Sequence, residues 1–176
     1  MAWKIRIAQA LVLAASCVPA SAANIASLSR EDVAQRILDL HNRERAAVGA
    51  PPLQWDPGLA TSAATYGPTL ASIGRLVHSP RAVRPGQREN LAMAWTETAS
   101  PDQLVGLWVE EKRLFHPGAF PNVTRTGNWA DVAHYTQMIW KGTTHVGCAV
   151  HTAPSGWSYL ICRYSPPGNI DGRPVP

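Results

Sequence analysis

The 176-residue sequence predicts an α+β domain in which helices accompany a small, mostly antiparallel sheet. Capping residues precede several stretches whose apolar residues recur at helical spacing, and two β-like segments near the end of the chain flank a turn. The length fits one domain of ordinary size, and the sequence contains no internal repeat or second apolar core.

The first predicted helix begins after Ser29, whose hydroxyl can accept a hydrogen bond from the exposed amides of the first turn. Val33, Ile37 and Leu40 follow at the spacing of one helical face. Gly49 marks the end of this helix, because glycine is common just beyond helix C-termini.

A second helix is predicted from Asp56-Pro57, an N-cap residue followed by proline at the first helical position, to about Gly74. Residues 76–90 are rich in proline, glycine and arginine and are predicted to form a long loop. Residues 90–95, "NLAMAW", indicate a short strand or an irregular apolar segment.

The third predicted helix starts at Ser100, with Gln103 placed to complete a capping box. At about 100° per residue one face of this helix is apolar, and it contains Leu104, Leu107, Trp108 and Phe115. Glu111 falls in the middle of that face, whereas Glu110 points away from it. A buried carboxylate is costly unless it is paired or ligated, so Glu111 either has a partner or lies at the margin of the face and reaches solvent.

Residues 128–137 are predicted to form a short helix, with strands from Met138 onward. The segments "HVGCAVH" and "WSYLICRY" indicate a hairpin centred near Ser155, which sets Cys148 opposite Cys162. Facing residues of a non-hydrogen-bonded pair lie within disulfide range, so we predict a disulfide bond between them. Two small buried thiols are the alternative.

Residues 1–22 are predicted to be a secretory signal, which leaves residues 23–176 as a single domain. A charged start precedes an apolar run that ends at the cleavage pattern Ala20-Ser21-Ala22. At about a dozen residues this run is too short to span a bilayer, and we expect no transmembrane segment in the mature chain. A lipoprotein signal ending at Cys17 is the alternative, and the protein is secreted or periplasmic in either case.

The charge of the chain gives little indication of a nucleic-acid surface. Removal of the signal lowers the formal net charge from +4 to +2, because Lys4 and Arg6 are lost. Arg81, Arg84 and Arg88 form one local basic cluster, interrupted by proline and glycine, which is typical of a solvated loop. We therefore expect no nucleic-acid partner.

The common catalytic motifs are missing from the sequence. It contains no HExxH zinc motif, no glycine-rich phosphate loop and no GxSxG nucleophile elbow. His134, His78 and Glu89 are candidate partners for Glu111. From the residues alone, the sequence predicts a polar cluster whose purpose stays open.

Several segments together resemble the signature motifs of the CAP superfamily, which comprises cysteine-rich secretory proteins, insect venom antigen five and plant pathogenesis-related proteins of class one. They are "LDLHNRERAAVGAPPLQWDPGLA", "REN", "LWVEEK", "HYTQMIW", "HVGCAV" and "ICRYSPPGNIDGRP". The resemblance covers residues 33–174 and is closest to plant-like and bacterial members.

This resemblance implies a three-layer α-β-α sandwich with a central cleft lined by two histidines and two glutamates. Matched motif by motif, the cleft residues are His78, Glu89, Glu111 and His134. The family motif thus selects the same glutamate that helical spacing places inside. His145 belongs to the following strand and is expected to be structural.

Some family members bind zinc in this cleft, so His78 and His134 are the ligands that the resemblance implies for zinc or another divalent cation. The two glutamates would orient the imidazoles or act through water. Without metal, the same four side chains can form a hydrogen-bonded network that stabilises the cleft. His78 and Glu89 are eleven residues apart, a longer spacing than is usual in the family.

The implied function is that of a secreted, non-catalytic binding protein. Its partner would be a small hydrophobic ligand, such as a sterol or fatty acid, or a host or cell-surface protein. The alternative is a metal-dependent hydrolase or protease, in which a zinc-bound water lies beside Glu89 or Glu111.

Overall fold

The structure is a computed structural model that describes residues 23–176. The predicted signal segment and Cys17 lie outside the described residues. The helices and strands are α1 (Arg30–Ala47), β1 (Gln54–Trp55), α2 (Pro57–Ala64), α3 (Gly67–Ile73), β2 (Arg88–Trp95), α4 (Pro101–Val109), β3 (Gly118–Ala119), α5 (Ala133–Ile139), β4 (His145–Thr152), β5 (Trp157–Ser165) and β6 (Pro174–Val175). Short 3₁₀ helices lie at η1 (Ile25–Ser27), η2 (Arg81–Val83), η3 (Glu110–Arg113) and η4 (Trp129–Val132).

The central sheet has the strand order β1-β4-β5-β2. Its pairs are antiparallel except for β1, which runs parallel to β4. The predicted hairpin is formed by β4 and β5, and their register places Cys148 opposite Cys162. A disulfide bond joins these two cysteines. Strands β3 and β6 make a separate antiparallel pair near the end of the chain.

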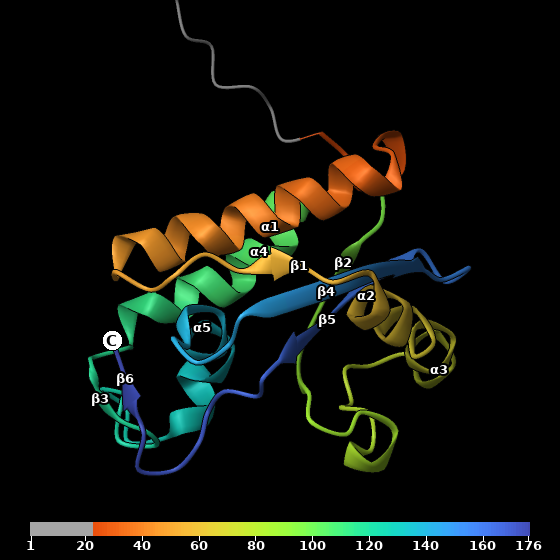
Figure 1. Ribbon diagram of the computed structural model, residues 1–176. Coiled ribbons are helices and arrows are strands. Elements are labelled where there is room, and N and C mark those ends of the chain that lie inside the picture. Colours follow the sequence, from red (N-terminus) through yellow and green to blue (C-terminus); the bar gives the residue numbers. More distant parts are fainter. Residues whose placement is uncertain (1–22) are drawn as a thin grey trace, which may run out of the picture.

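Helices cover both faces of the central sheet (Figure 1), which confirms the predicted three-layer α-β-α sandwich. On one face, Leu160, Cys162 and Tyr164 of β5 pack in a core shared with α1 and α4. On the other face, Tyr159 and Ile161 of the same strand pack in a core shared with α2 and α3. The alternation of the strand therefore supplies both cores.

The second predicted helix is two helices, so the prediction of a single helix to Gly74 is wrong. Helix α2 ends at Ala64 and α3 begins at Gly67. Pro68 has no amide hydrogen, and its ring would clash with the carbonyl of the preceding turn. The chain therefore stops one helix and starts another, with Pro68 in the first turn of α3.

The third predicted helix is α-helical only as far as Val109 and continues as the 3₁₀ helix η3. Leu107, predicted on the buried face, is 50% exposed, and Val105 is buried instead. The buried face is centred between Leu104 and Val105. At 100° per residue, Leu107 is rotated about 60° from Leu104 around the helix axis, in the direction away from Val105. It therefore lies outside the buried face and reaches solvent.

Two further boundaries differ from the prediction. Strand β2 begins at Arg88, inside the predicted loop, and pairs with β5 along its whole length. Helix α5 extends to Ile139, so the prediction of a strand from Met138 is wrong, whereas the first strand of the hairpin starts at His145 as the segment "HVGCAVH" predicts. A short apolar run is compatible with a buried helix as well as a strand, and here the helix forms. Within residues 23–176, no helix is long and apolar enough to cross a membrane.

Candidate functional site

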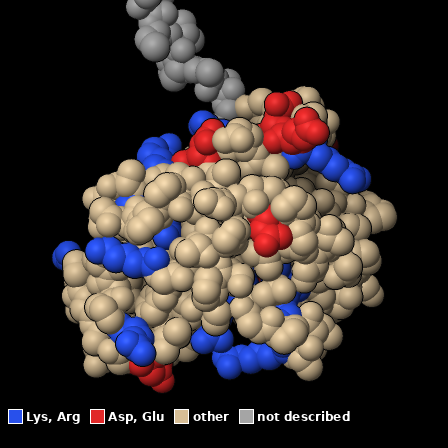
Figure 2. Space-filling model, viewed as in Figure 1, with Lys and Arg blue, Asp and Glu red and all other residues tan. Residues whose placement is uncertain are grey.

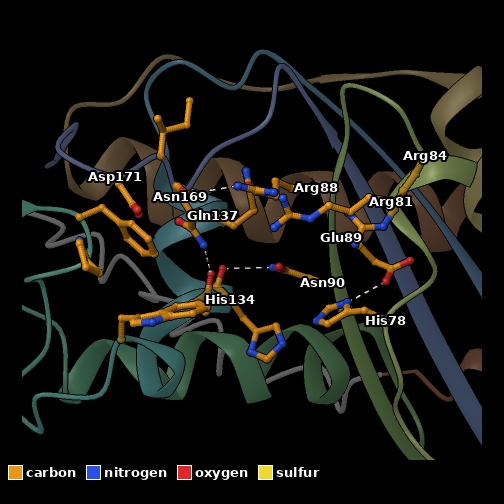
Figure 3. A pocket seen from close by; sticks show the side chains of 15 residues that line it. His78, Arg81, Arg84, Arg88, Glu89, Asn90, His134, Gln137, Asn169 and Asp171 are labelled. Atoms are coloured by element: carbon orange, nitrogen blue, oxygen red, sulfur yellow. Dashed lines mark hydrogen bonds and ion pairs between the residues drawn. The ribbon is translucent and has the colours of Figure 1, made fainter.

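A cavity of about 690 Å³ lies between the loop before β2, helix α5 and the segment after β5. His78, Glu89 and His134 line it, so three of the four predicted cleft residues reach one cavity. Figure 3 shows the side chains that surround it, with Asn90 between the two histidines in this view. Glu111 is not among the cavity-lining residues; it lies in η3 and contacts the imidazole of His134.

The first half of the site is the pair of His78 and Glu89. The Nδ1 of His78 lies 2.7 Å from Oε1 of Glu89. Ser79 donates its backbone N–H to the same oxygen and its hydroxyl to Oε2. Arg163, opposite Glu89 in the register of β2 and β5, forms an ion pair with Oε2 at 3.0 Å. The loop between His78 and Glu89 therefore folds back over the start of β2, which brings these two residues together despite their long spacing.

The carboxylate of Glu89 is kept ionised by its surroundings. Burial opposes ionisation, but the hydrogen bond from His78, the charge of Arg163 and the hydrogen bonds from Ser79 together lower the pKa of Glu89. The Glu89 side chain is fully buried, whereas the His78 side chain is 55% exposed. A fixed, buried anion thus holds the Nδ1 side of an imidazole whose other side reaches the cavity.

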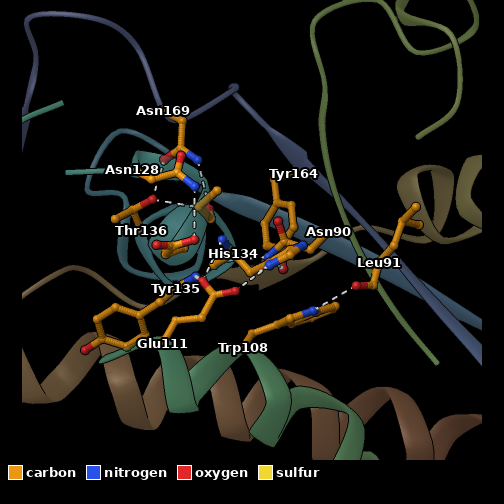
Figure 4. A network of polar contacts seen from close by, with 12 residues as sticks. Asn90, Leu91, Trp108, Glu111, Asn128, His134, Tyr135, Thr136, Tyr164 and Asn169 are labelled. Carbon is orange, nitrogen blue, oxygen red and sulfur yellow. Dashed lines mark hydrogen bonds and ion pairs between the residues drawn. The ribbon is translucent and has the colours of Figure 1, made fainter. Parts of the chain in front are cut away.

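The second half of the site is the pair of His134 and Glu111 (Figure 4). The Nδ1 of His134 lies 2.6 Å from Oε1 of Glu111. The other carboxylate oxygen accepts the backbone N–H groups of His134 and Tyr135, at 3.0 and 2.9 Å. The first amides of a helix have no partner within it, so Glu111 caps α5 as well as orienting the imidazole.

Trp108 supports the same imidazole. Its ring stacks on that of His134, with the centroids 6.0 Å apart and the planes 14° from parallel. The indole N–H of Trp108 donates to the carbonyl oxygen of Leu91 in β2, which fixes the ring between α4 and the sheet. Glu111 and Trp108 therefore hold His134 from two directions.

The structure places Glu111 against α5 and Glu110 in solvent, the orientation predicted from helical spacing. The change from α-helix to 3₁₀ helix at Glu110 does not alter this result, because Glu111 is only two positions into the new helix. The Glu111 side chain is 17% exposed and has a hydrogen-bond partner for each of its oxygens.

The two pairs share one geometry, in which a glutamate binds Nδ1 and leaves Nε2 free. Within residues 23–176, no hydrogen bond engages the Nε2 atom of His78 or His134. An imidazole that donates from Nδ1 to a carboxylate presents a neutral, basic Nε2, which is how metal-bound histidines are commonly oriented. In that same part of the chain, no group of three or more His, Cys, Asp or Glu side chains gathers as a metal site. The Nε2 atoms of His78 and His134 are thus available to a group that enters the cavity.

Some residues of the site are not evident from sequence reasoning. Asn90 donates to the carbonyl oxygen of His134 and to the hydroxyl of Tyr164, and so ties β2 to α5. Arg163 would be found if β2 were predicted from Arg88, because the register then sets Arg163 opposite Glu89. His145 lies outside the cavity, with its Nδ1 2.8 Å from the hydroxyl of the neighbouring Thr144.

Comparison with known proteins gives related sequences and related folds. Pathogenesis-related protein 1B of Nicotiana tabacum is 38% identical over 140 residues, which cover 79% of this chain and 78% of that protein. Pathogenesis-related protein 1 of Arabidopsis thaliana is 35% identical over 145 residues, which cover 82% and 83% of the two chains. A crystal structure of NaASP2 with Zn²⁺ is similar with a TM-score of 0.71 at 24% identity, covering 84% of this chain and 86% of that one.

The sequence profile of the cysteine-rich secretory protein family matches residues 38–164. This range includes all four histidine and glutamate residues of the site and both cysteines of the disulfide bond. The chain belongs to the cysteine-rich secretory protein family, also called CAP.

Proposed function

We propose that the protein is a secreted binding protein whose cleft holds zinc or another divalent cation through the Nε2 atoms of His78 and His134. The observation that carries this proposal is that both imidazoles line one cavity while a glutamate holds the Nδ1 of each. Zinc favours neutral imidazole nitrogen, and bound zinc would offer an open position to an acidic or polar ligand group. The crystal structure of NaASP2 with Zn²⁺, a protein of similar fold, lends support.

The alternative of metal-assisted hydrolysis is less well supported. Such a reaction needs a base that can take a proton from water. Both oxygens of Glu111 already accept hydrogen bonds from α5 and His134. Both oxygens of Glu89 are engaged by His78, Ser79 and Arg163. These contacts suit the glutamates to orienting the histidines, which favours binding over catalysis.

The cavity also has an apolar side that suits a hydrophobic ligand. Phe120, Trp129 and Ile170 line it, and the latter two are exposed large apolar residues. The rings of Phe120 and Trp129 pack edge to face with centroids 5.5 Å apart. A sterol or fatty acid is the ligand class we propose for this wall, and a host or cell-surface protein is the second class.

Export is part of the same proposal. The apolar run within residues 1–22 and its Ala-Ser-Ala end support cleavage before Ala23. The mass of the intact protein, recovered from the producing cell's exterior or periplasm, tests this. We expect the mass of a chain that starts at Ala23, and a mass that corresponds to a chain starting at an acylated Cys17 would contradict this proposal.

A calorimetric titration of zinc into EDTA-treated protein of residues 23–176 tests the proposed cation site. We expect about one zinc per chain for the wild type and a loss of binding in both His78→Ala and His134→Ala. His145→Ala is the matched control and should bind as the wild type does. Unchanged zinc affinity in both cleft variants would place the site elsewhere. Titration with cholesterol and palmitate, with Trp129→Ala as the variant, tests the ligand class separately.

A further inference from the structure

Three arginine side chains line the same cavity as the two histidines. Arg81 is the first residue of η2, Arg84 follows that helix directly, and Arg88 is the first residue of β2. Figure 3 shows them together on one side of the cavity. On the face drawn in Figure 2, basic side chains border a hollow in the lower part of the molecule.

The backbone and the loop hold two of these guanidinium groups in place. Arg84 is buried and donates from Nε to the backbone carbonyl and the hydroxyl of Ser79, and from Nη1 to the carbonyl of Gln87. Arg88 donates from Nε to the carbonyl of Gly168 and from Nη2 to that of Asn169. Each guanidinium has five N–H groups in a fixed fork, so both retain donors beyond these bonds.

Arg81 differs from the other two because it is exposed and free to move toward a ligand. Within residues 23–176, no hydrogen bond or ion pair involves its side chain. Its position in the cavity lining, next to two anchored arginines, therefore leaves an entire guanidinium available to an incoming group.

The positive charge of this wall is only partly balanced by the protein, because Asp171 is the one carboxylate besides Glu89 that lines the cavity of the described chain. In the described chain, no carboxylate lies within ion-pair distance of Arg81, Arg84 or Arg88. Glu89 lines the cavity, but its oxygens are already engaged by other groups. Burial and the neighbouring charges of Arg81 and Arg84 lower the pKa of Arg88, and the charge of Asp171 opposes this shift without cancelling it. The cluster thus carries a repulsion that a bound anion would relieve.

We propose that Arg81, Arg84 and Arg88 form a binding site for a phosphate or sulfate group of the cleft's ligand. The planar guanidinium fork matches the oxygens of a tetrahedral anion. A site with two or three arginines suits a ligand with two negative charges better than it suits a carboxylate, which has one. The apolar wall of Phe120 and Trp129 lies in the same cavity and would contact the body of the ligand. This inference rests on the proposed function, since it names the chemistry of the ligand for that cleft.

Calorimetric titration of EDTA-treated protein at low ionic strength tests the anion site. The probes are inorganic phosphate, inorganic sulfate, phenyl phosphate and dihexanoyl phosphatidic acid below its micelle concentration. We expect phosphate to bind and Arg81→Gln to weaken binding at least about tenfold, because a charge-assisted contact is lost. Arg81→Lys, which keeps the charge but not the fork, should show an intermediate affinity.

Arg113→Gln is the matched control, because Arg113 is an exposed arginine of η3 outside the cavity. An equal loss in Arg113→Gln and Arg81→Gln would show nonspecific charge attraction and overturn the proposal, as would wild-type protein that binds no phosphate or sulfate. Tighter binding of phosphatidic acid than of phosphate would indicate that the ligand is a lipid headgroup. Equal affinities would indicate that it is a free anion, and either result supports the arginine site.

The outcomes separate this inference from the proposed cation site. Protein that binds zinc through His78 and His134 but binds no oxyanion contradicts only the arginine site. Protein that binds phosphate through Arg81 but shows no zinc binding contradicts only the cation site.

Discussion

Glu111 and His134 are joined twice, once through the imidazole Nδ1 and once through the backbone N–H of the same histidine. The carboxylate therefore fixes both the start of α5 and the direction of the ring that α5 carries. A substitution of Glu111 can therefore change the zinc affinity of the cleft, the stability of the protein, or both, depending on which of its contacts the new side chain keeps. Two substitutions separate the effects.

Glu111→Gln should weaken zinc binding while preserving much of the helix cap. Its amide oxygen can still accept from the amides of α5, but its NH₂ group would face Nδ1 and move the imidazole proton to Nε2. Because Nε2 would then be a donor, we expect zinc affinity to fall by roughly 10–100-fold. Glu110→Gln is the control, since Glu110 is exposed. A zinc response lost in Glu110→Gln but kept in Glu111→Gln would contradict the assignment.

Glu111→Leu should destabilise the protein. It leaves the N–H groups of His134 and Tyr135 and the imidazole of His134 without their acceptor. An unsatisfied buried polar group costs about 1–3 kcal/mol, so we expect a loss of at least about 2 kcal/mol in urea unfolding. If Glu111→Leu unfolds at the same urea concentration as the wild type, the prediction is wrong, and water replaces the carboxylate without loss of stability.

His41 should make the stability of the protein depend on pH. It is fully buried in α1, with Nδ1 2.8 Å from the carbonyl of Ile37 and Nε2 2.8 Å from the hydroxyl of Tyr164. Burial, opposed by the hydrogen bond to Ile37 and assisted by the charge of Arg45, lowers the pKa of His41 to about 4. The unfolded chain takes up this proton at higher pH than the folded one, so stability is lost as pH falls from about 6.5 to about 4.

The loss attributable to His41 is of the order of 3 kcal/mol across that window. Urea midpoints of the wild type and His41→Gln, compared between neutral pH and about pH 4, should show a flatter profile for the variant. His116→Gln, which alters a histidine outside the core, should keep the wild-type slope. Parallel profiles for wild type and His41→Gln would contradict the assignment.

The disulfide bond should contribute to stability by restricting the unfolded chain. Cys148 and Cys162 are 14 residues apart, and closing a loop of that length contributes about 3 kcal/mol. The double variant Cys148→Ala, Cys162→Ala should therefore melt about 6–12 °C lower in a domain of this size. Reductant should lower the melting temperature of the wild type and leave the double variant unchanged. A reductant-insensitive wild type would mean that the bond does not form in the protein.

The elements predicted correctly are those with local signals. Ser29, Asp56 and Ser100 each accept a hydrogen bond from the first-turn amides of the helix that they were predicted to cap. The turn and the alternation of the hairpin were likewise enough to pair Cys148 with Cys162. Such signals depend on residues a few positions apart, so they can be recognised from the sequence alone.

The elements missed depend on contacts between distant segments. Strand β2 contains Arg88 and Glu89, which are unusual in a buried strand, and only pairing with β5 brings Arg163 to Glu89. Helical spacing placed Glu111 correctly but could not name its partner, and the family motif supplied His134. The arginines of the loop looked solvated in sequence because nothing local indicates that they line a cavity.

Nuclear magnetic resonance of ¹⁵N-histidine-labelled protein, titrated with zinc, tests the central claim most directly. The chain has six histidines, so each pair of ring nitrogens can be assigned through single substitutions. We predict that His78 and His134 are Nδ1-protonated before zinc is added, and that their Nε2 signals shift together up to one equivalent of zinc. Shifts confined to His41, His116, His145 or His151, with His78 and His134 unaffected, would contradict the account.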